Sequence, residues 1–273
     1  MAVQNAFEQK KRAILNEIGS TQPDLSPKGS IDVLCLPIID LINTSYDMVT
    51  TSSCSGRVSV FLEGTKSYNG EVKIGGKGQG GKWLYVTHNR DKVVGWLDEL
   101  MSKNEYAFET CGNHIPSEQI TGTTRYILYK YEPFILHVKC RDFQIASKLY
   151  NAAMSCGFRE SGIGSNNLVA IRINIKLDVP IGYLDESSDT LKLFVSPEYV
   201  NILDSLSLTK FDENARKMQA LYDKIDNELI NSISAPNSKT EASLIETKEE
   251  RRERKKKEGM ERQRQLKSTQ DQL

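Results

Sequence analysis

The segment TRYILYKYEPFILHVKCR, residues 124–141, places the strongest constraint on how this chain can fold. Its aromatic and β-branched residues favour strand structure on both sides of Glu132 and Pro133. Residues 142–156 follow with apolar residues spaced three and four apart, a pattern typical of an amphipathic helix. Strand material that leads directly into such a helix predicts a sheet with helices packed on it.

Other parts of the chain repeat this alternation. Strand patterns occur at residues 57–64, 82–88, 156–163, 168–175 and 191–195. Helical patterns occur at residues 5–19, 36–45, 92–103, 197–206 and 214–230. Ser196 is expected to cap the helix that begins at Pro197. The side chains expected to face inward from residues 92–103 are Val93, Val94, Leu97, Leu100 and Met101.

The order of these segments predicts an α+β fold, in the form of a layered α/β domain with a mixed sheet and packed helices. With 273 residues, of which 38% are hydrophobic, the chain can bury one good-sized core. Beyond residue 235 the sequence is polar and charged and offers few apolar anchors. We therefore expect one domain over residues 1–234 and a charged extension over residues 235–273, either disordered or an exposed helix.

The formal net charge is zero, but the charge is unevenly distributed. Residues 248–267 contain ten Lys and Arg against five Asp and Glu, which leaves a net charge of −5 for the rest of the chain. A nucleic-acid partner would therefore have to meet a local basic patch or this tail. Because the N-terminus is polar and no apolar run is long enough to span a membrane, we expect a soluble cytoplasmic protein without a membrane partner.

Five widely spaced cysteines without a C-x-x-C pair argue against a disulfide framework and a local zinc knuckle, and no metal site is predicted. His88, His114 and His137 allow a Cys-His pair in principle. His88 and His137 both close strand-like segments, so their side chains could converge at one end of a sheet. The glycine-rich run GGKGQGG lacks the phosphate-loop signature G-x-x-x-x-G-K-[ST] and predicts a flexible loop.

The run TTSSCSGR, residues 50–57, places one cysteine among small hydroxyl residues and ends in Gly56 and Arg57. It could contain a catalytic thiol, half of a metal site, an anion-binding loop or a plain turn. The hydroxyl groups and the arginine favour a turn lined with donors for an anion, in which Cys54 is a reduced packing residue. Trp83, next to Lys82, could stack on a base or fill the core.

Six motifs occur in a fixed order along the chain: DLSPKGSID, TTSSCSGR, KWLYVTH, YEPFILHVKCR, GFRESGI and LDVP. Together they resemble a family of tRNA-modifying methyltransferases, the third protein of wybutosine synthesis, in its fungal single-domain form. The resemblance implies methyl transfer from S-adenosylmethionine to the ring nitrogen N(4) of 7-(aminocarboxypropyl)-demethylwyosine, beside the anticodon of phenylalanine tRNA. It also implies a fold other than the Rossmann-type methyltransferase, which fits the missing glycine-rich fingerprint.

Within this resemblance, three residues are candidate proton acceptors in catalysis: Asp32, His88 and His137. Asp32 could instead pair with the ammonium group of the cofactor. The candidates for binding cofactor or substrate are Ser52, Ser53, Cys54, Ser55, Gly56, Arg57, Trp83, Arg141, Arg159, Ser161 and Arg172. The basic tail is expected to raise affinity for tRNA. Two alternatives stay open, a non-catalytic tRNA- or nucleotide-binding module that presents substrate to another enzyme and a Cys-His hydrolase that uses Cys54.

Overall fold

The structure is a computed structural model that describes residues 6–20, 29–65, 67–68, 71–72, 79–103, 105–111 and 120–231. His114, most of the GGKGQGG run and the charged tail lie outside these ranges. The chain divides into two compact units, Met1–Ser234 and Ala235–Leu273. The second unit falls outside the described residues, so the division into a domain and a charged extension stays a prediction.

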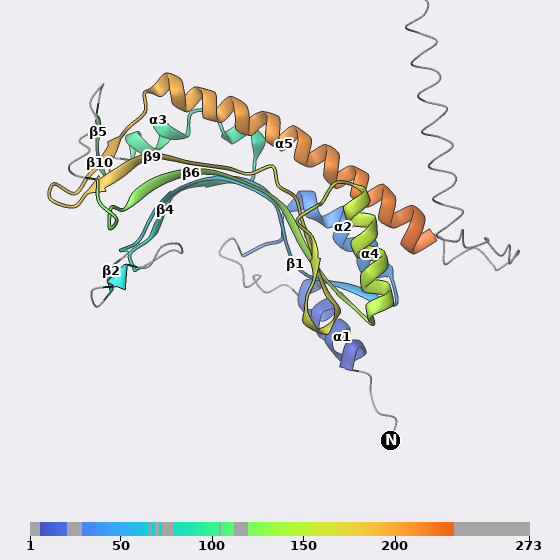
Figure 1. Cartoon of the computed structure of the whole chain (residues 1–273). Coiled ribbons are helices and arrows are strands. Elements are labelled where there is room, and N and C mark those ends of the chain that lie inside the picture. The colour runs from blue at the N-terminus through green and yellow to red at the C-terminus, as the bar shows by residue number, and fades with distance from the viewer. Residues whose placement is uncertain are drawn as a thin grey trace, which may run out of the picture. The chain divides into compact units, whose positions relative to one another are not determined.

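The helices and strands of the first unit follow one another in a mixed order (Figure 1). The α-helices are α1 (Ala6–Ile18), α2 (Leu36–Thr44), α3 (Trp96–Ser102), α4 (Phe143–Ser155) and α5 (Pro197–Ile225). Short 3-10 helices are η1 (Val33–Cys35), η2 (Arg90–Lys92) and η4 (Ser165–Asn167), and the π-helical turn η5 (Asp226–Ile230) follows α5. The long strands are β1 (Met48–Leu62), β4 (Lys82–Thr87), β6 (Tyr126–Cys140), β8 (Leu168–Arg172) and β9 (Leu177–Asp185). The short strands are β2 (Ser67–Tyr68), β3 (Glu71–Val72), β5 (Ala107–Thr110), β7 (Gly162–Ile163) and β10 (Thr190–Leu193).

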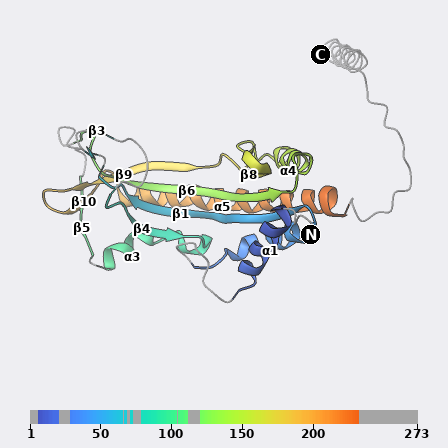
Figure 2. The same ribbon diagram turned by 90° about the horizontal axis from the view of Figure 1, so that it is seen from below.

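One mixed sheet forms the centre of this unit. Its strand order is β4-β1-β6-β9-β10-β5, and β8 pairs with β6 on one side and with β7 on the other. All of these pairs are antiparallel except β10 with β5, which is parallel. The sheet is strongly curved, and α5 runs along its convex side (Figure 1). From the concave side, β1 and β6 lie lengthwise in front of α5 (Figure 2).

Strand β6 changes its neighbour at the predicted break, Glu132 and Pro133. Residues Tyr126 to Tyr131 pair with β9, and residues Ile135 to Lys139 pair with β8. Proline has no N–H to donate to a neighbouring strand, so it is tolerated where pairing on that side is interrupted. The two strand segments predicted around Pro133 are therefore one strand of 15 residues.

Two hydrophobic cores lie along the same sheet. One contains Trp96, Tyr129 and Phe211 and is built from β1, β4, β6, α3 and the first half of α5. The other contains Phe158 and Met218 and is built from α2, α4, β8 and the second half of α5. The helices predicted at residues 197–206 and 214–230 form one continuous α5, which ends at Ile225 and leads into η5. Ser196 caps α5 as expected, and this helix covers both cores.

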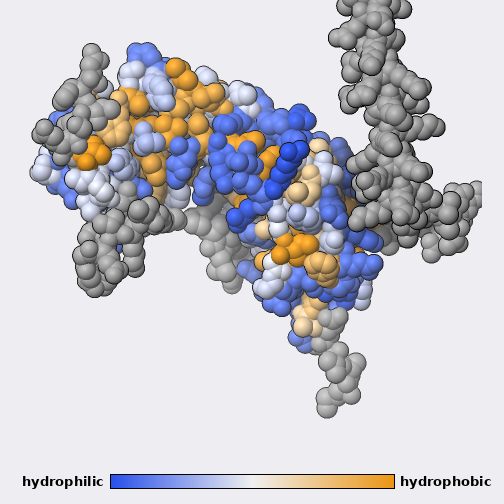
Figure 3. Space-filling view, viewed as in Figure 1, coloured by the Kyte–Doolittle hydropathy of each residue, from blue (hydrophilic) through white to orange (hydrophobic). Residues whose placement is uncertain are grey.

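Helix α3 is shorter and differently oriented than its sequence pattern predicts. It begins at Trp96, after Gly95 adopts a left-handed conformation with φ of 87°. Val94 and Met101 are exposed rather than inward, whereas Trp96 is buried. The first half of α5 exposes Ile202 and Leu206, and Figure 3 shows hydrophobic surface over this part of the molecule.

The remaining differences concern short segments. The strand predicted at residues 156–163 is mostly turn and ends in the two-residue β7, whereas β5 and β9 have no predicted counterpart. Helix α1 packs on the sheet through Phe7 and Ile14, which meet Val49. Within the described residues, no helix combines the length and apolar character needed to cross a membrane.

Candidate active site

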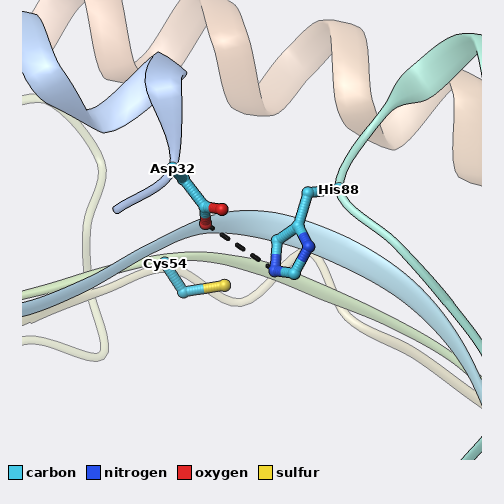
Figure 4. A group of neighbouring side chains, drawn as sticks. All are labelled: Asp32, Cys54 and His88. Carbon is cyan, nitrogen blue, oxygen red and sulfur yellow. Dashed lines mark ion pairs between the residues drawn. The ribbon is translucent and has the colours of Figure 1, made fainter. Parts of the chain in front are cut away.

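Asp32, Cys54 and His88 come together at an edge of β1 (Figure 4). Strand β4 pairs with β1 only as far as Val58, which lies opposite Thr87. His88 therefore comes immediately after the last paired residue of β4, where the preceding residues of β1 have no β4 partner. Asp32 stands directly before η1, so three separate parts of the chain contribute to this edge.

The carboxylate of Asp32 is buried and held by the backbone of the TTSSCSGR run. Its Oδ2 accepts hydrogen bonds from the backbone N of Ser55 at 2.9 Å and from the Ser55 Oγ at 3.2 Å. The Nε2 of His88 lies 3.7 Å from the same oxygen. A buried carboxylate needs such donors, because burial without them costs several kcal/mol. Asp32 and His88 thus form a carboxylate–imidazole pair with a fixed orientation.

Cys54 lies beside this pair, and its thiol is disfavoured as a nucleophile. Burial, with a smaller contribution from the charge of Asp32, raises the pKa of Cys54 above its ordinary value. A raised pKa keeps the thiol protonated near neutral pH, and only the thiolate is a strong nucleophile. This supports the view of Cys54 as a reduced packing residue and speaks against the Cys-His hydrolase.

Residues 52–56 are not the turn that the sequence predicted. They form the middle of β1, paired with β6 through Ser52 opposite His137 and Cys54 opposite Ile135. The backbone N of Ser55 donates to Asp32 and is therefore not directed at a bound anion. Small hydroxyl residues and glycine are typical of turns, but here antiparallel pairing along all of β1 overrides that local preference.

Gly56 provides the conformation that this part of β1 requires. Its φ is 102°, a value that L-residues with side chains rarely adopt. A Cβ at this position would lie 3.2 Å from the backbone O of Glu132 and 3.3 Å from the Nδ2 of Asn214. Both the backbone angle and the available space therefore require glycine.

Asn214 is a residue of the site that sequence reasoning missed. It is buried on α5, donates from Nδ2 to the backbone O of Ser55 at 2.8 Å, and accepts at Oδ1 from the backbone N of Phe134 at 2.8 Å. It thereby ties α5 to β1 and β6 where the two hydrophobic cores meet. The signal in the sequence was an amide at an inward position of an amphipathic helix.

His137 lies on β6, and the structure pairs it with Ser52 rather than with Asp32. The Nδ1 of His137 is 2.8 Å from the Ser52 Oγ. Burial, and to a lesser degree the positive charge of Arg172, lowers the pKa of His137. His137 is a member of β6 and does not close a strand, so the two histidines have different partners and different settings.

Arg57 and Trp83 form a stacked pair next to the site. The guanidinium carbon of Arg57 lies 5.0 Å from the ring centroid of Trp83, and its Nε donates to Glu132 at 2.7 Å. Trp83 also packs against Phe61, with ring centroids 4.7 Å apart. Trp83 is half-buried, so its side chain serves packing and also presents an aromatic surface beside an arginine.

The other predicted arginines have different settings, and only Arg172 is in register with Cys54, through Ile135 of β6. Arg141 donates to Asp47 and Glu8 and stacks on Phe7 and Tyr46, so it fastens α1 to the end of β6. Arg159 is exposed in the turn after α4. The Oγ of Ser161 accepts a hydrogen bond from the backbone N of Arg172 at 3.1 Å, at the end of β8.

Comparison with known proteins identifies the group to which this arrangement belongs. The family described as Methyltransferase TYW3 matches residues 9–227. The chain belongs to this methyltransferase family. The match includes Asp32, residues 50–57, His88 and Asn214, and it confirms the family that the six motifs resemble. The family match therefore favours a methyltransferase over the two alternative functions, a non-catalytic binding module and a Cys-His hydrolase.

Individual relatives agree with this assignment. The chain is 82% identical over its full length to tRNA wybutosine-synthesizing protein 3 of Saccharomyces cerevisiae, all of which is covered. It is 38% identical to the protein of the same name from Schizosaccharomyces pombe, over 82% of this chain and 88% of that one. The PH1069 protein of Pyrococcus horikoshii has a similar solved structure, with a TM-score of 0.58, 26% identity and coverage of 82% and 95%. The predicted α+β fold, distinct from the Rossmann type, is confirmed.

Proposed function

We propose that this methyltransferase acts on phenylalanine tRNA. In this proposal it methylates the ring nitrogen N(4) of 7-(aminocarboxypropyl)-demethylwyosine, with S-adenosylmethionine as the methyl donor. The names of the yeast relatives place them in wybutosine synthesis, and the family is one of methyltransferases. The observation that carries the proposal is the pair of Asp32 and His88, held together by Ser55 at an edge of the sheet. The expected cytoplasmic location stays a prediction.

The donor set near Asp32 fits the polar parts of S-adenosylmethionine. A carboxylate can pair with an ammonium group, and the Ser53 hydroxyl lies on the same strand two residues before Ser55. When bound, S-adenosylmethionine supplies an electrophilic methyl group on its sulfonium. Aromatic faces bind flat rings and cations, so the half-buried Trp83 is suited to adenine or to the tricyclic base. Val33 and Leu34, both exposed directly after Asp32, provide apolar surface next to the same carboxylate.

Asp32 and His88 are assigned to proton transfer. Methylation of a ring nitrogen forms an N–C bond, breaks the S–C bond of the donor and releases the proton carried by the nitrogen. An imidazole has a suitable pKa near neutral pH, and a carboxylate that faces it fixes its orientation and stabilises its charged form. In this arrangement His88 accepts the proton, and Asp32 holds the imidazole while Ser55 holds Asp32. His137, which faces Ser52, is the alternative acceptor.

Exposed arginines are assigned to binding the phosphate backbone of the tRNA. Arg159 and Arg172 are exposed near the end of β8, and Arg57 stacks on Trp83 close to the site. Arginine binds phosphate with two parallel hydrogen bonds, which makes these residues suitable for anchoring the anticodon arm. Arg141 is left out of this set because two carboxylates already neutralise it.

The proposed reaction is tested by nucleoside mass spectrometry of phenylalanine tRNA from cells that lack this protein. The expected result is accumulation of the base that is short by one methyl group. Addition of the purified full chain and S-adenosylmethionine to that tRNA should restore the missing mass. Fully modified base in the deletion cells, or no restoration by the pure protein, would overturn the assignment. Calorimetric titration with S-adenosylmethionine, in which heat of binding is expected, tests the cofactor separately.

A further inference from the structure

The cluster at the edge of β1 also has the composition of a metal-binding site. It offers a carboxylate oxygen from Asp32, a sulfur from Cys54 and an imidazole nitrogen from His88, and these atoms lie within 4.8 Å of one another. Within the described ranges it is the one group of three such residues that meets this distance. Asp32 and Cys54 are 22 positions apart in sequence, and Cys54 and His88 are 34 apart, so the three residues do not have the local spacing of a zinc knuckle.

The separations suit a small tetrahedral ion. An ion that binds nitrogen and oxygen at about 2.0 Å and sulfur at about 2.3 Å holds its ligand atoms roughly 3.3–3.7 Å apart. The Nε2 of His88 is already 3.7 Å from the Oδ2 of Asp32. The sulfur of Cys54 has to approach by no more than about 1.5 Å, because the three ligand atoms already lie within 4.8 Å of one another.

The electrostatic setting also favours a cation. Asp32 is buried, and its Oδ2 lies 3.7 Å from the Nε2 of His88. A divalent ion compensates the charge of a buried carboxylate and deprotonates a coordinating thiol. The hydrogen bonds from Ser55 to Asp32 resemble the outer contacts that orient metal-binding carboxylates. Oxygen, nitrogen and sulfur ligands together select a borderline-soft ion such as Zn²⁺ over Mg²⁺ or Ca²⁺.

We propose that Asp32, Cys54 and His88 bind one divalent ion of the zinc class, with a fourth position left open. Binding releases the proton of the Cys54 thiol and forms a thiolate–metal bond without any change of oxidation state. The ion occupies the Oδ2 of Asp32 and the Nε2 of His88, the two atoms that face each other in the pair assigned to proton transfer. Zinc is therefore an inhibitor of methyl transfer at this site. The binding step stands independently of the proposed function, whereas the inhibition rests on it.

The test is a titration of the metal-free full chain with cobalt(II) chloride, followed in the near-ultraviolet and visible range. We expect one equivalent of cobalt per chain, a thiolate-to-cobalt charge-transfer band and displacement of cobalt by zinc chloride. Cys54→Ser should abolish the band, and His88→Gln should weaken binding by more than the roughly 10- to 100-fold typical of changes outside the ligand set. Cys111→Ser is the matched control, since Cys111 is a half-buried thiol outside the cluster, and it should keep the band.

Several results would overturn the metal site. These are no band in the unmodified chain, a band that persists in Cys54→Ser, or equal loss in Cys111→Ser. If Cys54→Ser does not fold, as judged by circular dichroism, His88→Gln decides, because glutamine keeps a polar group beside Asp32. Methyl transfer with and without zinc separates the two proposals. Inhibition with the affinity found by titration supports both, whereas tight binding without inhibition leaves the metal site and refutes the role of Asp32 and His88 in proton transfer.

Discussion

The side-chain amide of Asn214 donates a hydrogen bond to the backbone carbonyl of Ser55 at 2.8 Å, and this bond joins the long helix to the strand that carries the candidate site. The amide oxygen of Asn214 accepts from the backbone of Phe134, so the same side chain spans β1 and β6. Ser55 in turn donates two hydrogen bonds to Asp32. Asn214 therefore positions the carboxylate of Asp32 through Ser55.

Replacement of Asn214 by Ala should destabilise the protein and reduce turnover. The carbonyl of Ser55 and the N–H of Phe134 would each lose a buried partner, so we expect a loss of about 2–5 kcal/mol in the free energy of unfolding. Urea unfolding measures this loss, and methyl transfer on phenylalanine tRNA measures the effect on kcat. Gln219→Ala is the control, since Gln219 makes an exposed side-chain hydrogen bond on the same helix. Equal stability of both variants would refute the role assigned to Asn214.

Gly56→Ala should be more damaging than Gly95→Ala. Both glycines have a positive φ, 102° and 87°, and both substitutions therefore carry backbone strain. Only at Gly56 would the new Cβ also meet neighbouring atoms at 3.2–3.4 Å, whereas Gly95 has nothing within 4 Å. We expect a cost of about 1 kcal/mol at Gly95 and a clearly larger one at Gly56. Thermal and urea unfolding of the two variants test this, and similar costs would contradict the packing argument.

The two histidines should differ in their importance for catalysis. His88→Gln removes the imidazole that faces Asp32, and a lost general base typically lowers the rate about 100-fold or more. His137→Gln retains a polar group opposite Ser52 and is expected to have the smaller effect on kcat. Single-turnover methylation at saturating tRNA and S-adenosylmethionine compares the two variants directly. A larger loss in His137→Gln would transfer the role of proton acceptor to His137.

Asp204 should make stability depend on pH. This buried residue accepts hydrogen bonds from Trp96 at 3.1 Å and Tyr129 at 2.9 Å, but burial dominates and raises its pKa. As pH rises above about 4, Asp204 ionises in the unfolded chain before it ionises in the folded protein. This earlier ionisation stabilises the unfolded state, and the effect grows until pH exceeds the raised pKa of Asp204 in the folded protein. The contribution of Asp204 to stability is thus present at low pH and lost as pH rises.

Asp204→Asn removes this titration. The difference in unfolding free energy between the variant and the unmodified protein should therefore shift in favour of the variant as pH rises above about 4. Each tenfold change in the acid constant corresponds to about 1.4 kcal/mol. Urea unfolding at several pH values measures the difference, with the exposed Asp212→Asn as a control for a carboxylate whose pKa is instead lowered by Arg90. A difference that is independent of pH would contradict the prediction.

Removal of residues 234–273 should weaken tRNA binding without altering the chemical step. The segment of residues 248–267 carries a net charge of +5, and each phosphate contact made by a cation releases counterions. The loss of affinity should therefore be largest at low salt and shrink as salt is added. Filter binding or fluorescence titration across a salt series measures this, and kcat at saturating tRNA serves as the control. Unchanged affinity at low salt would exclude the tail from tRNA binding.

The sequence alone determined the parts of this protein that depend on neighbouring residues. Periodicity located α1, α2, α4, β4 and the capped start of α5, because the spacing of apolar residues reflects which face of an element is buried. The ordered motifs were sufficient to indicate the methyltransferase family, which the match over residues 9–227 confirmed. Asp32 and His88 were selected as candidates from residue type and position within these motifs.

Only the tertiary structure decided how these residues meet. Residues 52–56 have the composition of a turn, yet pairing with β6 makes them strand, because hydrogen bonds to a distant segment outweigh local preference. The edge of β1 that receives Asp32 and His88 exists because β4 ends its pairing at Thr87. Asn214 acts on Ser55 across 159 positions of sequence, a relation that no local pattern contains. Local interactions fixed the elements, and long-range hydrogen bonding and packing fixed the site.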